Sequence, residues 1–265
     1  MPETEHISFV DALLQFPPVT LAEMDSVKLL NRIDTKYLTG EAVLLGILED
    51  AASAGYRVLV TDGSRISPYD SVYFDTPSLG MFLDHHNRRL DRQKVRTRSY
   101  VNSGETFLEI KRKNNKGRTK KKRMRIPLSE FGDFRFDKEA AAFLAANSRY
   151  TVEELSPVLE TVFKRITLVN AAMTERLTID TCLVFKNFRT GIEASLKDAV
   201  IIELKQDGRA ASRMKGILLE RRVKPVRVSK YCIAVTLTEP EVKSGRFKVK
   251  VRRIEKTINK KITVI

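Results

Sequence analysis

Basic side chains recur at every second position in several segments of strand length. In residues 92–101, Lys94, Arg96 and Arg98 alternate with Val95 and Thr97. Successive side chains of a β-strand point to opposite faces, so the three cations share one face. Arginine forks bind phosphate oxygens in pairs and lysines act as compact point charges, so this face predicts a site for phosphate groups. The same spacing recurs in Lys121, Arg123 and Arg125.

Isolated carboxylates share these basic faces. Glu109 alternates with Lys111, and Glu203 alternates with Lys205. Carboxylate oxygens are ligands for hard divalent cations, which bridge phosphate oxygens and offset developing negative charge. The pattern therefore predicts that a metal ion accompanies the phosphates. The remaining alternating sets are Arg32, Asp34 and Lys36, then Arg176, Thr178 and Asp180, and Lys113 beyond Lys111.

A solvent-exposed face is the simpler explanation of any one such strand, because an antiparallel sheet often buries only its other face. Six strands with the same pattern favour instead a sheet that closes into a barrel, with helices outside and the charged faces lining a polar channel. Like charges inside a protein repel one another and require partners. A phosphate chain with a divalent cation would supply those partners.

The positive charge of the chain is concentrated in two segments. The net charge is +15, yet residues 88–125 hold sixteen Lys and Arg against three acids, and residues 243–265 hold nine against one. Such segments attract polyanions: nucleic acid, an anionic membrane surface or phosphate-rich small molecules. With 42% hydrophobic residues in 265, the rest is typical of a globular protein.

Hydrophobic periodicity predicts several helices and many strands joined by short turns. We expect an antiparallel α+β fold in which 1–30 form a helical lead-in, 31–240 a barrel domain and 241–265 a basic strand or arm. The expected helices are 40–54, 78–85, 137–147, 210–221 and 231–237, the last also compatible with a strand. The expected strands are 32–38, 56–61, 68–74, 92–101, 106–113, 119–127, 158–169, 173–180, 182–187 and 200–206.

Other features of the sequence predict little chemistry. Cys182 and Cys232 have the spacing of neither a disulfide framework nor a zinc site. His85 and His86 are adjacent and poorly placed to share one metal ion, so we expect structural roles. Asp75 precedes Thr76-Pro77 and predicts a helix cap or turn. No apolar run is long enough to span a bilayer and the first residues are polar, so we expect a cytoplasmic protein.

An ordered set of motifs resembles the VTC polyphosphate-polymerase domain of the CYTH, or triphosphate-tunnel, superfamily. The set extends over residues 31–237 in the order of that family. The motifs are Arg32-Ile33-Asp34-Thr35-Lys36-Tyr37, Tyr73-Phe74-Asp75-Thr76-Pro77, His85-His86-Asn87, Lys94-Val95-Arg96-Thr97-Arg98-Ser99-Tyr100, Phe107-Leu108-Glu109-Ile110-Lys111, Arg176-Leu177-Thr178-Ile179-Asp180, Ile202-Glu203-Leu204-Lys205 and Ser229-Lys230-Tyr231.

The resemblance implies an eight-stranded, closed antiparallel β-barrel with peripheral helices, in which the γ-phosphate of ATP is added to inorganic polyphosphate with Mn²⁺ or Mg²⁺. It implies a catalytic set, a substrate-binding set and metal ligands led by Glu203. The catalytic set is Lys36, Arg96, Arg98, Lys111, Arg176 and Lys230. The substrate-binding set is Arg32, Lys94, Lys121, Arg123, Arg165, Lys205 and Ser229, and the metal ligands are Glu203, Glu109 and Asp180.

Two departures from the family pattern modify this expectation. Many tunnel enzymes carry Glu-x-Glu-x-Lys on the first strand, where this chain has Arg32-x-Asp34-x-Lys36. Replacing a carboxylate by arginine favours longer anions over a metal-rich triphosphatase site. The eukaryotic relatives carry a regulatory and a membrane domain that have no counterpart here, so we expect a stand-alone enzyme.

Three alternatives remain open from the sequence. A hydrolase of triphosphate or polyphosphate on the same fold would differ only in positioning water. A nucleic-acid-binding protein would explain the basic segments, with Tyr100 and Phe107 as stacking platforms, but tryptophan is absent and no helix-turn-helix or RNP pattern occurs. A membrane-surface scaffold would use the basic tail, but that role needs an apolar partner face, which the tail lacks.

Overall fold

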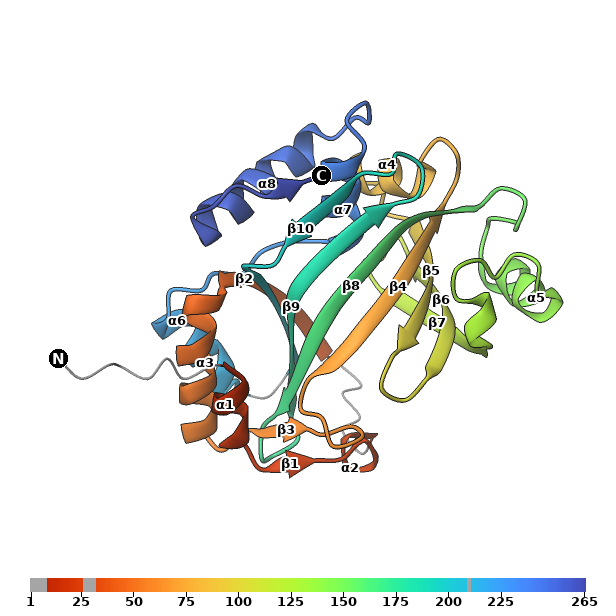
Figure 1. The fold of residues 1–265 in the computed structure, drawn as a ribbon. Helices are drawn as coiled ribbons and strands as arrows, with labels where there is room; N and C mark the ends of the chain where they lie inside the picture. The colour runs from red at the N-terminus through yellow and green to blue at the C-terminus, as the bar shows by residue number, and fades with distance from the viewer. Residues whose placement is uncertain (1–8, 26–31, 209–210) are drawn as a thin grey trace.

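A large antiparallel sheet forms the centre of the computed structural model, which describes residues 9–25, 32–208 and 211–265 (Figure 1). Its main path runs in the order β2-β11-β9-β8-β4-β5-β6-β7. These strands are β2 (Arg32–Gly40), β4 (Ser67–Asp75), β5 (Arg92–Tyr100), β6 (Glu105–Lys113), β7 (Thr119–Ile126), β8 (Ser156–Val169), β9 (Glu175–Asn187) and β11 (Ala199–Asp207).

Short strands and helices complete the described part of the chain. The short strands are β1 (Pro18–Val19), β3 (Arg57–Leu59), β10 (Glu193–Leu196) and β12 (Thr263–Val264). The helices are α1 (Phe9–Leu14), α2 (Leu21–Asp25), α3 (Glu41–Ser53), α4 (Gly80–His86), α5 (Lys138–Asn147), α6 (Arg213–Glu220), α7 (Lys230–Thr238) and α8 (Gly245–Ile258), with a 3-10 turn at Leu128–Glu130. Parts of the predicted lead-in, residues 1–8 and 26–31, lie outside the described residues.

The expected closed, eight-stranded barrel is not what the hydrogen bonds form. The sheet has 12 strands, and among the described residues no pairing joins β2 to β7, the two ends of the main path. The reason lies at the outer edge of β2. There Tyr37 pairs with Pro225, and the backbone N–H of Val226 donates to the carbonyl of Lys36 at 2.7 Å. The segment that leads into α7 therefore occupies the edge that β7 would need.

The strands predicted at 173–180 and 182–187 are one strand, β9. Cys182 has a positive φ of 51°, and the pairing with β8 shifts register between Val162 and Lys164. This irregularity lets β9 change partners. Its first half pairs with β11, and residues 183–186 pair with β10, a short strand that the sequence analysis did not predict.

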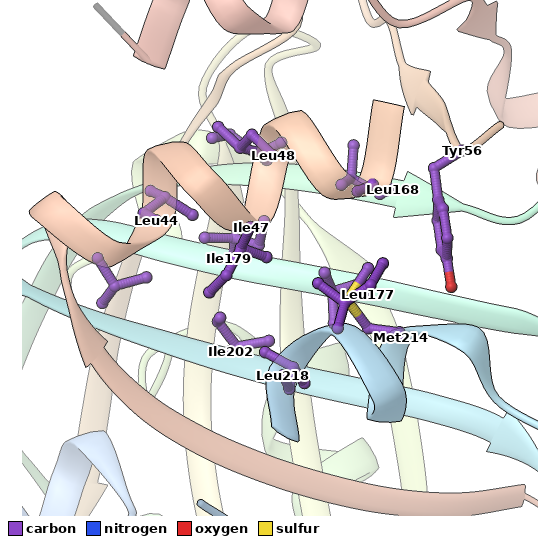
Figure 2. Packing of buried hydrophobic residues seen from close by; sticks show 14 of the residues in the cluster. Leu44, Ile47, Leu48, Tyr56, Leu168, Leu177, Ile179, Ile202, Met214 and Leu218 are labelled. Atoms are coloured by element: carbon purple, nitrogen blue, oxygen red, sulfur yellow. The ribbon is translucent and has the colours of Figure 1, made fainter. Parts of the chain in front are cut away.

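One face of the sheet, called here the outer face, is apolar and covered by helices. Leu177, Ile179 and Ile202 are fully buried against α3 and α6 (Figure 2). Farther along the sheet, Leu108 and Ile110 pack with Leu144 of α5. Because side chains alternate along each strand, the basic residues between these apolar positions point to the opposite, inner face.

Helix α7 lies against the inner face at one end of the sheet. The ring of Tyr231 stacks on that of Tyr73 of β4, with centroids 5.0 Å apart. The buried Asp75 carboxylate accepts hydrogen bonds from Tyr231 Oη and from the backbone N–H groups of Met81 and Phe82, at 2.8 and 3.0 Å for the amides. Asp75 therefore caps α4, as the sequence predicts, and ties it to α7.

Most of the basic tail is helix α8, so the prediction of a strand or extended arm was wrong for that part; only the short strand β12 follows it. Alternation holds only from Phe247 to Val251, whereas Phe247, Val251, Ile254 and Ile258 follow the three-to-four spacing of a helix and pack with the residues of α7. Burial of this apolar face decides the conformation. Within the described part of the chain, no helix combines the length and apolarity that crossing a bilayer requires.

Candidate functional site

The first carboxylate of the inner face is Glu109 on β6. It is fully buried and accepts hydrogen bonds from Arg96 Nε at 2.8 Å and Nη2 at 2.5 Å. It also forms an ion pair with Lys121. The register places Arg96 of β5 directly opposite. Burial alone would raise the pKa of Glu109, but Arg96, Arg98 and Lys121 together hold it well below its usual value. Glu109 is therefore a fixed negative charge between cations.

Asp180 on β9 forms a second cluster of the same kind. Arg165 of β8 donates to both carboxylate oxygens, from Nε at 2.6 Å and Nη2 at 2.8 Å. Lys230, the first residue of α7, forms an ion pair with the same carboxylate. Although burial opposes ionisation, these two cations hold the pKa of Asp180 well below its usual value.

Glu203 on β11 forms the third cluster. Lys36 of β2 lies opposite in register and pairs with one carboxylate oxygen, and Lys205 Nζ lies 3.5 Å from the other. Burial would raise the pKa of Glu203, yet Lys205 and Lys36 lower it to about 2. Its side chain is 21% exposed, against 0% for Glu109 and 6% for Asp180, so Glu203 is the carboxylate most open to a ligand.

Arg98 lies between these clusters without a carboxylate partner among the described residues. Its Nε donates to Ser71 Oγ at 2.9 Å, and its guanidinium lies 5.3 Å from the ring centroid of Tyr69 and 5.6 Å from that of Phe163. Burial and the neighbouring Arg96 lower the pKa of Arg98. A buried cation beside other cations gains strongly when an anion binds.

The pKa values of lysines near the three clusters are also lowered. The guanidinium of Arg96 and then burial lower the pKa of Lys111 well below its usual value. Burial, followed by Arg165, does the same to Lys230. Burial also lowers the pKa of Lys205. Glu203 raises this pKa, but Arg176 and Arg165 offset part of that increase. A bound phosphate would raise the pKa of each of these lysines again.

The N-terminal end of α7 adds polar groups to the same face. Ser229 caps the helix by accepting the N–H of Cys232, and it accepts a hydrogen bond from Lys94 Nζ at 2.7 Å. The backbone of this first turn and Lys230 therefore point their positive ends toward the basic strands. The ammonium group of Lys230 also lies 3.2 Å from the ring centroid of Phe163.

The structure brings the expected site residues onto one face with a single exception. Arg176 lies opposite Lys205 in register, and the guanidinium of Arg123 lies 4.6 Å from the ring centroid of Phe107. Arg32 belongs to β2, but its side chain lies outside the described residues. We call the face formed by the following residues the centre: Lys36, Lys94, Arg96, Arg98, Lys111, Lys121, Arg123, Arg165, Arg176, Lys205, Ser229 and Lys230, with Glu109, Asp180 and Glu203.

Sequence reasoning missed the aromatic groups that support the arginines. Tyr73 Oη accepts a hydrogen bond from Arg96 Nη1 at 2.9 Å, and Arg165 lies 4.7 Å from the ring centroid of Tyr69. The alternation Tyr69-Ser71-Tyr73 on β4 carried this signal. The histidines, in contrast, have the structural roles that were expected: His85 Nδ1 lies 3.0 Å from Cys232 Sγ, and His86 contacts the backbone of Arg246.

A divalent cation fits this donor set only together with phosphate. Each of the three carboxylates is already engaged by two cations, and the described residues contain no group of three or more acidic, His or Cys side chains that could hold a metal ion. Magnesium-type ions are commonly held by one or two carboxylates plus substrate phosphates and water. Glu203, the most exposed carboxylate, fits that arrangement best.

Comparison with known families adds a decisive observation: the model of the VTC domain matches residues 31–239. The chain belongs to the VTC domain family. Membership supports an enzyme that acts on phosphate chains, which agrees with the basic inner face of this VTC domain. A search of curated proteins found no match.

Several solved structures resemble this VTC domain at low sequence identity. A putative adenylate cyclase from Bacillus halodurans has a TM-score of 0.51 and 13% identity, over 76% of this chain and 96% of its own. Another from Vibrio parahaemolyticus has a TM-score of 0.45 and 9% identity, over 76% and 95%. A putative adenylyl cyclase from Hippeastrum, described as having dominant triphosphatase activity, has a TM-score of 0.46 and 14% identity, over 77% and 95%. The TM-score with the Bacillus halodurans protein shows that the two proteins share a fold.

Proposed function

We propose that this VTC domain is a polyphosphate polymerase that transfers the γ-phosphate of ATP to the end of an inorganic polyphosphate chain. The observation that carries the proposal is the centre itself: three carboxylates, each between two cations, set within a larger excess of Lys and Arg on one face of the sheet. A phosphate chain supplies the negative charge that this face lacks.

The reaction is a displacement at phosphorus that needs no protein nucleophile. A terminal oxygen of the polyphosphate attacks the γ-phosphorus in line, the bond from that phosphorus to the bridging β,γ-oxygen breaks, and ADP leaves with the electron pair. Such transfers pass through a loose transition state, so the protein acts by positioning and by stabilising charge. Atoms and charge balance without a further reactant.

The residues of the centre divide this work. Arg98, held by the rings of Tyr69 and Phe163 and by Ser71 at its Nε, presents its two Nη groups to the oxygens of the transferred phosphoryl group. Arg165, whose Nε and Nη2 bind Asp180, adds positive charge beside it. Lys36, Lys205 and Arg176 bind further phosphates at the end of the sheet where β2 and β11 pair. Lys230 and Ser229 act from α7. Glu203 would hold the divalent cation, which would offset the negative charge that develops on ADP.

Chain growth is the direct test. Purified protein is incubated with ATP, Mn²⁺ and a short polyphosphate primer, and the products are separated on a gel while ADP is measured. Longer chains and an equal amount of ADP are expected. Shortening of the primer to phosphate without ATP would make the protein a hydrolase and overturn the proposal. Arg98→Met, which preserves apolar contact with Tyr69 and Phe163, is the variant that should lose chain growth.

A further inference from the structure

A second group of cations lies beyond the centre and contains a residue of α8. It consists of Arg88, Arg92, Lys113 and Lys250, which we call the mouth cluster, and it adjoins Lys94 of the centre. Lys250 Nζ lies 4.8 Å from the ring centroid of Phe247, whose ring in turn contacts His85 edge to face at 5.4 Å. His85 contacts Cys232 Sγ, and Ser229 at the start of the same helix binds Lys94. A continuous set of contacts thus connects α8 to the inner face.

The electrostatic surroundings of His85 identify the other members. Burial and then Lys94, Arg92, Lys250 and Lys113 lower the pKa of His85 to about 3. Burial lowers the pKa of Lys250, and Lys94 and Arg88 are among the cations that lower it further. The strand register agrees: Lys113 lies opposite Arg92, and Arg92 lies two residues from Lys94 on the same face of β5.

No carboxylate among the described residues forms an ion pair with any member of the mouth cluster. The nearby acids are engaged elsewhere: Asp84 pairs with Arg149, and Asp91 with Arg112 at 3.0 Å. On α8 the acid Glu255 pairs with Lys261 at 3.2 Å. The cluster consequently has a positive charge that only an added anion can neutralise.

The mouth cluster continues the track of cations in the centre. Along β5 the inward positions Arg98, Arg96, Lys94 and Arg92 recur every second residue, so they follow one another at about 7 Å. Lys111 lies opposite Lys94 in register, and Lys113 lies opposite Arg92. The track is longer than a single triphosphate contact requires, and it leads from Arg98 toward α8.

We propose that the mouth cluster binds phosphate units of a long polyphosphate chain outside the centre, so that the chain passes between β5, β6 and α8. The inference rests on the proposed function for its substrate class. Lys250 lies outside residues 31–239, the part that the family model matches. Helix α8 thereby turns a site for a short anion into one that retains a polymer.

Two other polyanionic partners suit the surface less well. Single-stranded nucleic acid binds through bases stacked on exposed aromatic rings, but Phe247 and Tyr231 are each 2% exposed. An anionic membrane would require a free apolar face on α8, and that face, with Phe247 and Ile254, is buried in the protein. A phosphate chain needs only the cations.

The test compares Lys250→Gln with Lys248→Gln, because Lys248 is an exposed lysine on the other side of the same helix. Binding of inorganic tripolyphosphate and of long-chain polyphosphate is measured at several salt concentrations. Lys250→Gln should weaken long-chain binding about five-fold, or roughly 1 kcal/mol, and reduce the salt slope by about one unit. Its affinity for tripolyphosphate should not change, and Lys248→Gln should change neither ligand.

A second variant on another element protects the test against a local folding defect. Lys113→Gln, at the end of β6, should reproduce the selective loss of long-chain affinity. Unchanged long-chain binding in both variants, an equal loss in Lys248→Gln, or an equal loss for tripolyphosphate would overturn the inference. So would a single-stranded RNA that binds as tightly as the chain and responds equally to Lys250→Gln.

The same experiment separates failure of this inference from failure of the proposed function. If the wild-type protein binds no tripolyphosphate, the centre is not a phosphate site and both ideas fall. If tripolyphosphate binds well but the long chain gains nothing from Lys250 and Lys113, only the role of the mouth cluster is lost.

Discussion

The centre and the mouth cluster are both basic, yet they are built in different ways. In the centre, Glu109, Asp180 and Glu203 each hold two cations at fixed distances before any ligand binds. In the mouth cluster the cations have no carboxylate partners among the described residues; Arg88 is exposed and the others are half-buried. Fixed ion pairs pre-organise groups for chemistry, whereas loose cations attract a polyanion and tolerate its movement.

The comparison also shows why carboxylates belong in a site for anions. Arg96 and Arg165 would repel their neighbours if they were packed together alone. Glu109 and Asp180 offset that repulsion and orient each guanidinium through two hydrogen bonds. The carboxylates therefore make a dense array of cations compatible with folding, a task that the more exposed mouth cluster does not have.

The largest expected effect is on stability, from Arg165→Leu. The substitution leaves the buried Asp180 with Lys230 alone, and breaking a buried ion pair typically costs about 3–5 kcal/mol. Urea denaturation should show a loss of that order. Lys250→Gln, in the mouth cluster, should change stability by less than about 0.5 kcal/mol. Equal stability of the two variants would contradict the distinction between the regions.

Arg98→Met should separate binding from stability within the centre. Arg98 has no carboxylate partner among the described residues and is repelled by Arg96, so its loss removes repulsion while the methionine keeps contact with Tyr69 and Phe163. We expect stability within about 1 kcal/mol of wild type and tripolyphosphate binding weakened at least about ten-fold. Titration calorimetry and denaturation measure both; intact binding would remove Arg98 from the site.

Glu203→Gln should weaken the binding of the divalent cation. The amide keeps the size of the side chain but loses the charge that a divalent cation requires, so the metal concentration needed for half-maximal tripolyphosphate binding should rise about 10–100-fold. Glu109→Gln, at the fully buried carboxylate, is the comparison and should act mainly on stability. A metal titration unaffected by Glu203→Gln would exclude it as a ligand.

The smallest effect concerns protons. Arg96 and burial lower the pKa of Lys111, and an adjacent phosphate raises it again, so the pKa of this lysine should be higher in the complex than in the free protein. Binding should therefore take up protons, and affinity should fall as the pH rises. Calorimetry in two buffers of different ionisation enthalpy measures the uptake, which Lys111→Met should reduce. Proton release on binding would contradict this account.

The sequence predicted the basic faces well because their signal is local. Alternation along a strand needs no knowledge of partners, and it placed Lys94, Arg96 and Arg98 together correctly. The turn-bounded strands β5, β6 and β7 followed from the same reasoning. Asp75 was also correctly predicted as a cap, since its position before Thr76-Pro77 carries that information.

Features that depend on contacts distant in the chain were not predictable. Closure of the barrel is prevented by Pro225 at the edge of β2, about 190 residues from Tyr37, and no local pattern reports it. The conformation of the tail was predicted wrongly because its five alternating residues fit both a strand and a helix. Only burial against α7 decides between the two.

The most direct test of the central claim follows the transferred phosphoryl group itself. ATP labelled at the γ-phosphate is incubated with the protein, Mn²⁺ and an unlabelled polyphosphate primer, and the label is located after separation of the products. The polymerase account predicts label in the chain, with one ADP formed for each unit incorporated and with incorporation lost in Arg98→Met. Label found only as free phosphate, with the primer unchanged in length, would contradict it.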